Sequence, residues 1–159
     1  MRSSNLMFLT IFSMSCCISL ARYVHFSRDF LNAHNKARAE VGVPPLRWNK
    51  ALALYAKIYA KSKLHDCKME HSNGPYGENL AEASWVMNNT EIVNYWVTEK
   101  VNYDHNSGSC VNEECGHYRQ IIWRDTVQVG CAKDKCSNGW MFAICSYYPP
   151  GNVFGQRPY

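Results

Sequence analysis

Two imidazoles and two carboxylates carry the most obvious chemistry in this sequence. Two histidines with two acidic residues suit a borderline cation such as Zn²⁺. The same groups could exchange protons with a bound water molecule, or they could form a buried ion-pair and hydrogen-bond network with a structural role. Residue types alone leave these three readings open. The four residues are His71, Glu78, Glu99 and His117.

The elements around these four residues determine how they are positioned. The run from Cys115 to Trp123 is short and rich in β-branched and aromatic residues, so it predicts a strand with His117 at its head. Glu99 falls on the apolar face of a predicted helix, where a carboxylate must be paired or must open onto a cleft. His71 and Glu78 lie in a loop broken by glycine and proline.

Three amphipathic helices are predicted in the first two thirds of the chain. Each begins at a residue whose side chain can accept hydrogen bonds from free backbone N–H groups. The second helix is apolar almost all round, so we expect it to be largely buried. The expected bounds are Ser27 to Gly42, Asn49 to about His65, and Thr90 to about Asn102.

Further strands are predicted at 127–132 and 140–147, with Ser137-Asn138-Gly139 as the turn between them. The last strand is apolar on both sides, which indicates a sheet covered on both faces. Helices followed by strands, with two faces to cover, predict an α+β fold. We expect a three-layer α-β-α sandwich with a small antiparallel sheet.

The first 21 residues are typical of a secretory signal peptide. Arg2 supplies the positive charge, Leu6 to Phe12 begin the apolar stretch, and Ser19 and Ala21 are small residues at the positions that signal peptidase reads. The stretch is too short and too broken by serines for a membrane anchor, and we expect no transmembrane segment. Cleavage after Ala21 would leave residues 22–159 as one domain.

Six of the eight cysteines lie outside this leader. An even set in a short secreted chain predicts a disulfide framework, although spacing alone cannot choose the pairs. A zinc ribbon is the alternative, and the secretory context disfavours it. The six are Cys67, Cys110, Cys115, Cys131, Cys136 and Cys145.

Charge and motif content exclude several function classes. The formal net charge is +4 and the basic residues are spread along the chain, so nucleic acid is not an expected partner. There is no Gly-x-Ser-x-Gly motif, no His-Glu-x-x-His helix and no cysteine left over as a nucleophile. Ser72 stands beside His71, but adjacent loop residues rarely point at each other. We therefore expect no enzymatic activity.

Three ordered segments resemble the signature motifs of the CAP superfamily, which comprises cysteine-rich secretory proteins, antigen 5 and the group-1 pathogenesis-related proteins of plants. They are Pro75–Leu80, Gly116–Trp123 and Cys145–Asn152. The resemblance extends from about Phe30 to Tyr159, and the ending Gly-Gln-Arg-Pro-Tyr resembles the plant branch. It implies the same sandwich architecture and a secreted protein of the apoplast or vacuole, expected to be monomeric.

The resemblance also implies a site and a disulfide pattern. It places the two histidines and two glutamates named above around one cleft. Zinc is the metal that such a cleft would hold, although no cofactor is expected to be required. The implied pairs are Cys67–Cys136, Cys110–Cys115 and Cys131–Cys145.

Two functions follow from the resemblance. Family members bind sterols near the end of the third helix and in the following loop, which makes Trp96 and Tyr103 the candidate residues here. Plant members also release a defence-signalling peptide, which would require a receptor. Pro149 to Tyr159 matches that peptide, but Tyr148 stands at the cleavage point where an acidic residue is typical.

Two further positions carry expectations. Arg119 stands where the family has threonine, and strand alternation would place it on the side of His117, where a permanent cation disfavours a bound metal. Asn88 begins a glycosylation sequon. The leading hypothesis is a secreted antimicrobial defence protein, directed at fungi or oomycetes, that binds sterol. The alternatives are a peptide precursor and, third, a metal-dependent hydrolase.

Overall fold

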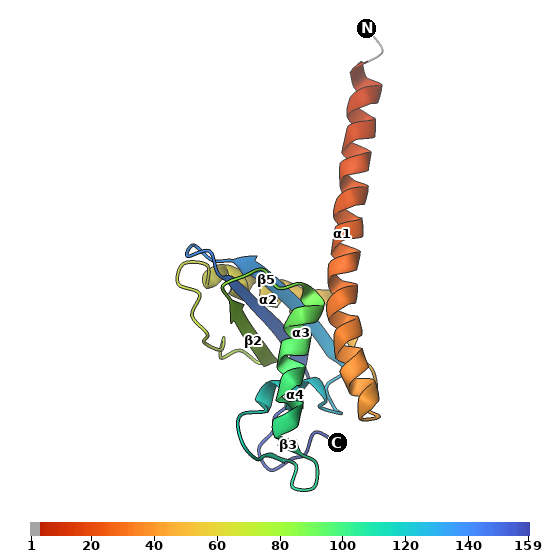
Figure 1. The fold of residues 1–159 in the computed structure, drawn as a ribbon. Helices are drawn as coiled ribbons and strands as arrows, with labels where there is room; N and C mark the ends of the chain where they lie inside the picture. Colours follow the sequence, from red (N-terminus) through yellow and green to blue (C-terminus); the bar gives the residue numbers. More distant parts are fainter. Residues whose placement is uncertain (1–3) are drawn as a thin grey trace.

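Helices and strands alternate along the chain rather than occupying separate halves (Figure 1). The computed structural model describes residues 4–159, with side chains from Ile18 onward. The α+β class predicted from the sequence is confirmed. The elements are α1 (Ser4–Glu40), β1 (Arg47–Trp48), α2 (Lys50–Ser62), β2 (Gly77–Ala83), α3 (Asn89–Val97), η1 (Thr98–Asn102), β3 (Tyr103–Asp104), β4 (Ser109–Cys110), α4 (Gly116–Ile121), β5 (Gln128–Lys135) and β6 (Met141–Tyr148).

The main sheet has four strands in the order β1-β5-β6-β2. Strand β6 is antiparallel to both β5 and β2, and of these two pairs the sequence predicted β5–β6; β1 runs parallel to β5, so the sheet is mixed. The sequence reading missed both edge strands. Strand β2 was expected to be a loop as far as Leu80, because its polar residues hide the alternation that marks a strand.

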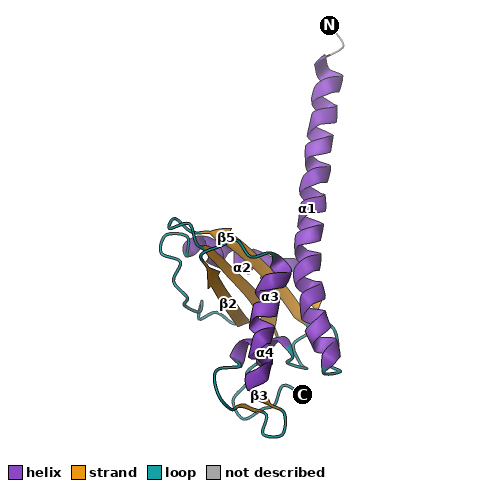
Figure 2. Cartoon of the chain, viewed as in Figure 1, coloured by secondary structure: helices purple, strands orange, loops and turns teal. Residues whose placement is uncertain are grey.

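Helices cover both faces of this sheet and form the predicted three layers (Figure 2). Leu80, Phe142 and Ile144 pack into the cluster that includes α2. Their neighbours Ala81 and Ala143 pack on the other face with α1, α3 and α4. Successive side chains along a strand point to opposite faces of the sheet. The residues of β2 therefore alternate between these two environments.

Helix α1 is much longer than the sequence predicted. Ser27 was expected to begin the helix, but it lies inside α1 and its hydroxyl donates to the Val24 carbonyl at 3.1 Å. The N-terminal part of α1 projects away from the sheet (Figure 1), and side chains 18–22 are exposed. Within the described residues, no helix is both long and apolar enough to span a membrane. Residues 1–3 of the expected leader lie outside the described part of the chain.

Asparagine side chains begin α2 and α3. The Asn49 side chain accepts hydrogen bonds at the start of α2, as predicted. Asn88, not Thr90, caps α3, and it forms a reciprocal capping box with Glu91. The sequon asparagine is therefore exposed at a helix terminus. Helix α3 continues into the 3₁₀ helix η1, which carries Glu99.

Three disulfides join distant segments, and their pairs are those that the family resemblance implied. Cys67–Cys136 ties the loop after α2 to the residue after β5, and its partners are 69 residues apart in sequence. Cys110–Cys115 closes a short loop before α4. Cys131–Cys145 links the paired strands β5 and β6.

Candidate functional site

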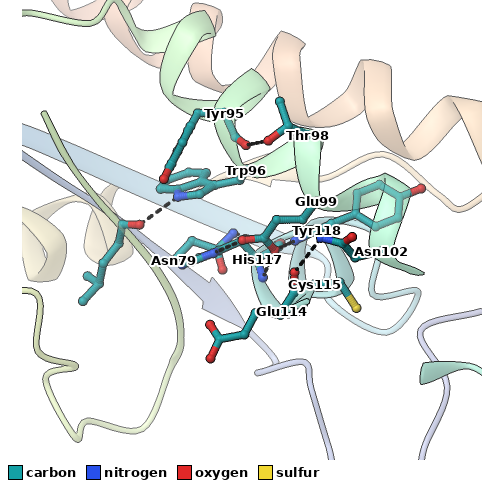
Figure 3. Close-up of polar contacts among 12 residues, drawn as sticks. Asn79, Tyr95, Trp96, Thr98, Glu99, Asn102, Glu114, Cys115, His117 and Tyr118 are labelled. Carbon is teal, nitrogen blue, oxygen red and sulfur yellow. Dashed lines mark hydrogen bonds and ion pairs between the residues drawn. The ribbon is translucent and has the colours of Figure 1, made fainter. Parts of the chain in front are cut away.

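The segment around His117 is the helix α4, not the predicted strand. A carboxylate from η1 holds its first turn (Figure 3). Glu99 accepts hydrogen bonds from the backbone N–H groups of His117 and Tyr118, at 2.9 and 3.1 Å. The N-cap residue Cys115 makes no side-chain capping bond of its own. Glu99 therefore satisfies N–H groups that the helix leaves free and complements its dipole.

The His117 imidazole forms the second half of this arrangement. Its Nδ1 lies 2.5 Å from Glu99 Oε1, and its ring stacks on Trp96 with the centroids 6.1 Å apart. An ionised carboxylate only accepts hydrogen bonds, so this contact favours a proton on Nδ1, and in the neutral imidazole the lone pair then lies on Nε2. This Nε2 is the atom that could bind a cation or accept a proton.

Arg38 holds the other end of α4. Its guanidinium is 1% exposed and donates to the carbonyls of Ile121 and Trp123 at 2.8 and 2.7 Å, and also to those of Pro44, Arg124 and Thr126. Burial lowers the pKa of Arg38 to about 10. The six-residue helix is thus fixed by an acidic side chain at one end and a basic side chain at the other, as its dipole favours.

His71 and Glu78 form a second pair. His71 Nδ1 lies 3.2 Å from Glu78 Oε2, and the imidazole is exposed while the carboxylate is 4% exposed. Glu78 also accepts hydrogen bonds from the backbone N–H and the hydroxyl of Ser72. Ser72 in turn contacts the Tyr55 hydroxyl of α2 at 2.7 Å. Glu78 therefore fixes the loop before β2 against α2.

The two pairs approach β2 from different sides. Glu78 has the parity of Leu80, which faces α2, whereas the buried Asn79 donates to the His117 carbonyl at 3.0 Å. Among the residues that the structure describes, no three histidine, cysteine or acidic side chains are arranged to hold a metal ion. The structure thus forms two separate His–Glu pairs, each suited to structural hydrogen bonding.

The prediction that Arg119 faces the His117 side was wrong. On a helix, residues two apart point roughly 200° away from each other, whereas on a strand they share a face. Arg119 reaches the C-terminal tail and donates to the Gln156 carbonyl at 3.3 Å. Repulsion between the Arg119 guanidinium and a metal ion near His117 is therefore no longer a reason to expect weak metal binding.

The two sterol candidates lie in different environments. Trp96 is fully buried and its indole donates to the Leu80 carbonyl at 2.8 Å, so it belongs to the core. Tyr103 is partly exposed and packs edge-on against Tyr118. Its hydroxyl is buried and has no hydrogen-bond partner among the described residues. Burial, with a contribution from Tyr159, raises the pKa of Tyr103.

The C-terminal tail folds back over this region. Tyr159 stacks on His105, with the ring centroids 4.9 Å apart, and lies 6.2 Å from Tyr103. Further bonds hold the tail to α4 and to the segment after it: Gly151 N–H to Gln120, Asn152 to the Gly116 carbonyl, and Arg124 N–H to the Pro158 carbonyl. The prolines and glycines of residues 149–159 predict an irregular, exposed tail; most of it is exposed, but Pro158 is buried and Tyr159 is half-buried.

The cleavage point expected after Tyr148 lies at the end of β6. The Tyr148 carbonyl accepts a hydrogen bond from the Val127 N–H at 3.0 Å, and the next carbonyl, that of Pro149, accepts from the Thr126 hydroxyl at 2.9 Å. The side chain of Tyr148 is itself exposed. The side chain is therefore accessible while the backbone is held in the fold.

A cavity of about 540 Å³ borders the Glu99 pair. It is lined by the aromatic ring of Tyr95, by Val101, and by the carboxylates of Glu99, Glu113 and Glu114. Its acidic lining favours cations and hydrogen-bond donors as ligands. Glu99, whose carboxylate pairs with His117 Nδ1, connects this cavity to the His117 imidazole.

Sequence reasoning missed two residues that organise the site. Arg38 falls four residues after His34, so it shares the apolar face of its helix, and a buried cation could have been inferred from that spacing. Asn79 connects β2 to α4 and donates also to the Tyr147 hydroxyl at 3.2 Å. No local signal marks it, because its strand was not recognised.

The chain matches known proteins over most of its length. The family described as "Cysteine-rich secretory protein family" (CAP) matches residues 31–147. The basic form of pathogenesis-related protein 1 of Nicotiana tabacum is 49% identical over 152 residues, which cover 92% of this chain and 86% of that protein. Pathogenesis-related protein 1 of Arabidopsis thaliana is 48% identical over 132 residues, which cover 83% and 81%.

Solved structures share the same fold. Venom allergen-like protein 4 of Schistosoma mansoni is 31% identical with a TM-score of 0.65, and the match covers 84% of this chain and 92% of that one. NaASP2, solved with Zn²⁺, has a TM-score of 0.70 and covers 84% of each chain. It is 22% identical, so that likeness concerns the fold alone.

Proposed function

The chain belongs to the cysteine-rich secretory protein family (CAP), and from this premise we propose that it is a secreted plant defence protein that acts on fungi or oomycetes by binding sterol. Plant pathogenesis-related relatives at 48% and 49% identity support the defence role. The three disulfides support an oxidising, extracellular destination. We also propose that the protein is a monomer.

The unpartnered hydroxyl of Tyr103 is the observation that carries the sterol proposal. A buried hydroxyl without a hydrogen bond costs free energy, and a ligand hydroxyl can recover it. The tyrosine ring offers a flat apolar surface beside that polar atom, which suits a sterol ring and its hydroxyl. Trp96 is excluded as a direct contact by its complete burial.

Sterol titration of the purified protein and of Tyr103 variants tests this proposal. We expect Tyr103→Ala to weaken sterol binding by about tenfold or more, and Tyr103→Phe to lose only the hydroxyl part of that effect. Trp85→Ala is the control, because Trp85 is an exposed aromatic residue in the loop between β2 and α3, before the start of that helix. Unchanged affinity in Tyr103→Ala would remove the support for this site.

A second function is release of the segment Pro149–Tyr159 as a signalling peptide recognised by a receptor. It is supported by the exposure of Tyr148 and of the middle of the tail, where Phe154 is fully exposed. Incubation of the intact protein with extracellular fluid from a plant, followed by mass spectrometry, tests the release. A tail that stays attached over the lifetime of the protein would argue against it.

A metal-dependent hydrolase is the weakest of the three candidates. We propose that the protein is not an enzyme and that zinc, if it binds, uses the lone pair of His117 Nε2. Zinc calorimetry with His117→Ala as control, and turnover assays with a chelator, test both statements. Because Arg119 points to the tail, Arg119→Thr should leave zinc affinity unchanged, contrary to the expectation from the sequence.

Secretion is proposed through removal of residues 1–21. The described side chains 18–22 are exposed, and among the described side chains Tyr23, whose hydroxyl accepts from the Trp48 indole at 3.1 Å, is the first to make a hydrogen bond with a residue outside α1. Cleavage after Ala21 would thus remove a segment whose described side chains lie in solvent. N-terminal sequencing of the secreted protein tests the position.

A further inference from the structure

The glycosylation sequon lies where the loop after β2 enters α3, outside both His–Glu pairs and the sterol candidates. It is the single Asn-x-Ser/Thr sequence of the chain and comprises Asn88, Asn89 and Thr90. Asn88 and Thr90 are exposed, whereas Asn89 is buried and its amide donates to the Phe26 carbonyl at 3.0 Å. The two side chains by which a sequon is recognised are therefore the two that face solvent.

The helix cap formed by Asn88 leaves the glycosylation atom free. Asn88 Oδ1 accepts a hydrogen bond from the Glu91 N–H at 2.9 Å, and Glu91 Oε2 accepts one from the Asn88 N–H at 2.7 Å. The cap thus uses the side-chain oxygen and the backbone, and Nδ2 makes no hydrogen bond to a described residue. A sugar bonded to Nδ2 leaves Oδ1 in place as an acceptor, so α3 keeps its cap after modification.

Two large apolar side chains are exposed just before this asparagine. Trp85 is 65% exposed and Val86 is 73% exposed. The next residue, Met87, is buried, and its carbonyl accepts a hydrogen bond from the Lys133 ammonium at 2.6 Å. Met87 therefore anchors the loop, and its exposed neighbours belong to a segment that the fold holds. A tryptophan ring gains more than most side chains from being covered, because its apolar area is large.

We propose that Asn88 carries an N-linked glycan whose first sugar packs on the Trp85 ring. The modification rests on the secretory route proposed above, which supplies the donor, an oligosaccharide carried on a lipid diphosphate. A bond forms between Asn88 Nδ2 and C1 of the first N-acetylglucosamine, and the bond from C1 to the phosphate oxygen breaks. The lipid diphosphate leaves with the electron pair, and the amide loses one proton.

The short connection between the two residues brings the sugar within reach of the ring. Trp85 stands three residues before Asn88, so their Cα atoms lie at most about 11 Å apart. One face of an N-acetylglucosamine ring presents C–H groups, and this apolar face suits the flat surface of an indole. The glycan therefore covers apolar surface that Trp85 otherwise exposes, and it adds a bulky, solubilising group at the start of α3.

Mass spectrometry of the full chain secreted from plant cells tests the attachment. We expect a glycopeptide that contains Asn88, and an amidase that cleaves the Asn–sugar bond in heavy-oxygen water should convert this residue to labelled aspartate. Thr90→Ala should abolish the modification, and the matched Thr90→Ser should retain it. Asn88→Asp removes the acceptor amide but keeps an oxygen that caps α3, so it separates loss of the glycan from loss of the cap. An unmodified Asn88 in the secreted protein overturns the proposal.

Melting temperatures before and after enzymatic removal of the glycan test the contact with Trp85. We expect removal to lower the melting temperature of the native protein by about 2–4 °C more than that of Trp85→Ala. The comparison cancels the conversion of asparagine to aspartate, which both proteins share. Phe154→Ala is the control and should show the native shift, because this exposed ring lies in the tail that leaves the opposite end of β6. Equal shifts in the native protein and Trp85→Ala would refute the contact.

A foreign signal peptide in place of residues 1–21 separates this proposal from the secretory route on which it rests. If the native chain is not secreted, while the chain with the foreign leader is exported and glycosylated, the proposed route fails and the assignment of Asn88 stands. If the exported chain is unmodified at Asn88, the assignment fails whichever leader directs it.

Discussion

His34 is a titratable residue enclosed in the core between α1 and β6. Its Nε2 lies 2.7 Å from the Tyr147 hydroxyl, and burial lowers its pKa from 6.5 to about 4. The unfolded chain takes up this proton near pH 6.5, whereas the folded protein does so only near pH 4. Stability is therefore complete above the higher value and falls as the pH decreases through this window.

Acid unfolding of a His34 variant tests this assignment. Over the window, His34 should account for a loss of about 3 kcal/mol in unfolding free energy. We expect His34→Gln to flatten the fall between pH 6.5 and 4, whatever its effect on stability at neutral pH. The exposed His65→Gln serves as the control and should retain the slope. A parallel slope in His34→Gln would refute the role of this residue.

Arg38 is the second residue whose burial has a measurable consequence. Arg38→Met removes the donors to the buried carbonyls of Ile121, Trp123 and Thr126, so we expect a loss of about 2–4 kcal/mol in unfolding free energy. Lys36→Met, at an exposed position on the same helix, should change stability by less than about 0.5 kcal/mol. Chemical denaturation of the two variants makes the comparison, and equal effects would contradict the capping role.

At the scale of elements, α4 shows why part of the site could not be predicted. Its sequence is rich in β-branched and aromatic residues, and that local preference favours a strand. The helix forms because Glu99 and Arg38, from η1 and α1, satisfy its two ends. Neither partner is near α4 in sequence, so the local sequence pattern could not reveal them.

The start of α2, where the cap residue is marked by the sequence, was predicted well. Asn49 lies directly before an apolar repeat, and α2 begins there as expected. Because its helical spacing put it on an apolar face, Glu99 was expected to be paired or to open onto a cleft, and it both pairs with His117 and lines a cavity. The predicted direction of the Arg119 side chain was wrong because a strand was predicted where the chain forms a helix, and side-chain directions repeat with a different period in the two. Strand β2 was missed because its register depends on β6, which lies far along the chain.

Removing the charge of Glu99 should loosen α4. The neutral amide of Glu99→Gln accepts hydrogen bonds less strongly and no longer complements the helix dipole, so we expect a loss of about 1–2 kcal/mol. Glu113→Gln, at an exposed position on the same cavity, is the control. Hydrogen exchange at the amides of His117 and Tyr118 should accelerate in the first variant only. Unaltered exchange would mean that Glu99 does not hold the helix.

The disulfides differ in how much of the chain they constrain. Cys67–Cys136 closes a loop of 69 residues, whereas Cys110–Cys115 closes one of 5. A longer closed loop restricts the unfolded chain more, with native bridges typically contributing about 2–5 kcal/mol. Cys67→Ser should therefore lower the melting temperature more than Cys110→Ser does. Equal shifts in calorimetry would contradict this order.

At the scale of the whole molecule, the tail connects the candidate sites. It leaves the sheet at the end of β6, crosses α4 and ends over the hairpin that carries Tyr103. Its rings and hydrogen bonds cover the face on which sterol binding is proposed. Sterol binding at that face would therefore depend on the position of Tyr159, whose ring lies 6.2 Å from that of Tyr103.

Because the Tyr148 carbonyl accepts a hydrogen bond from the Val127 N–H, the rate of the proposed peptide release depends on how often this end of β6 opens. A protease requires an extended segment free of pairing, so the end of β6 must detach before the chain can be cut. When closing is faster than cutting, the rate of release is proportional to the fraction of molecules that are open. A ligand that binds only the closed form reduces this fraction. The folded domain would then set the rate at which its own peptide is released, and a bound ligand would lower that rate.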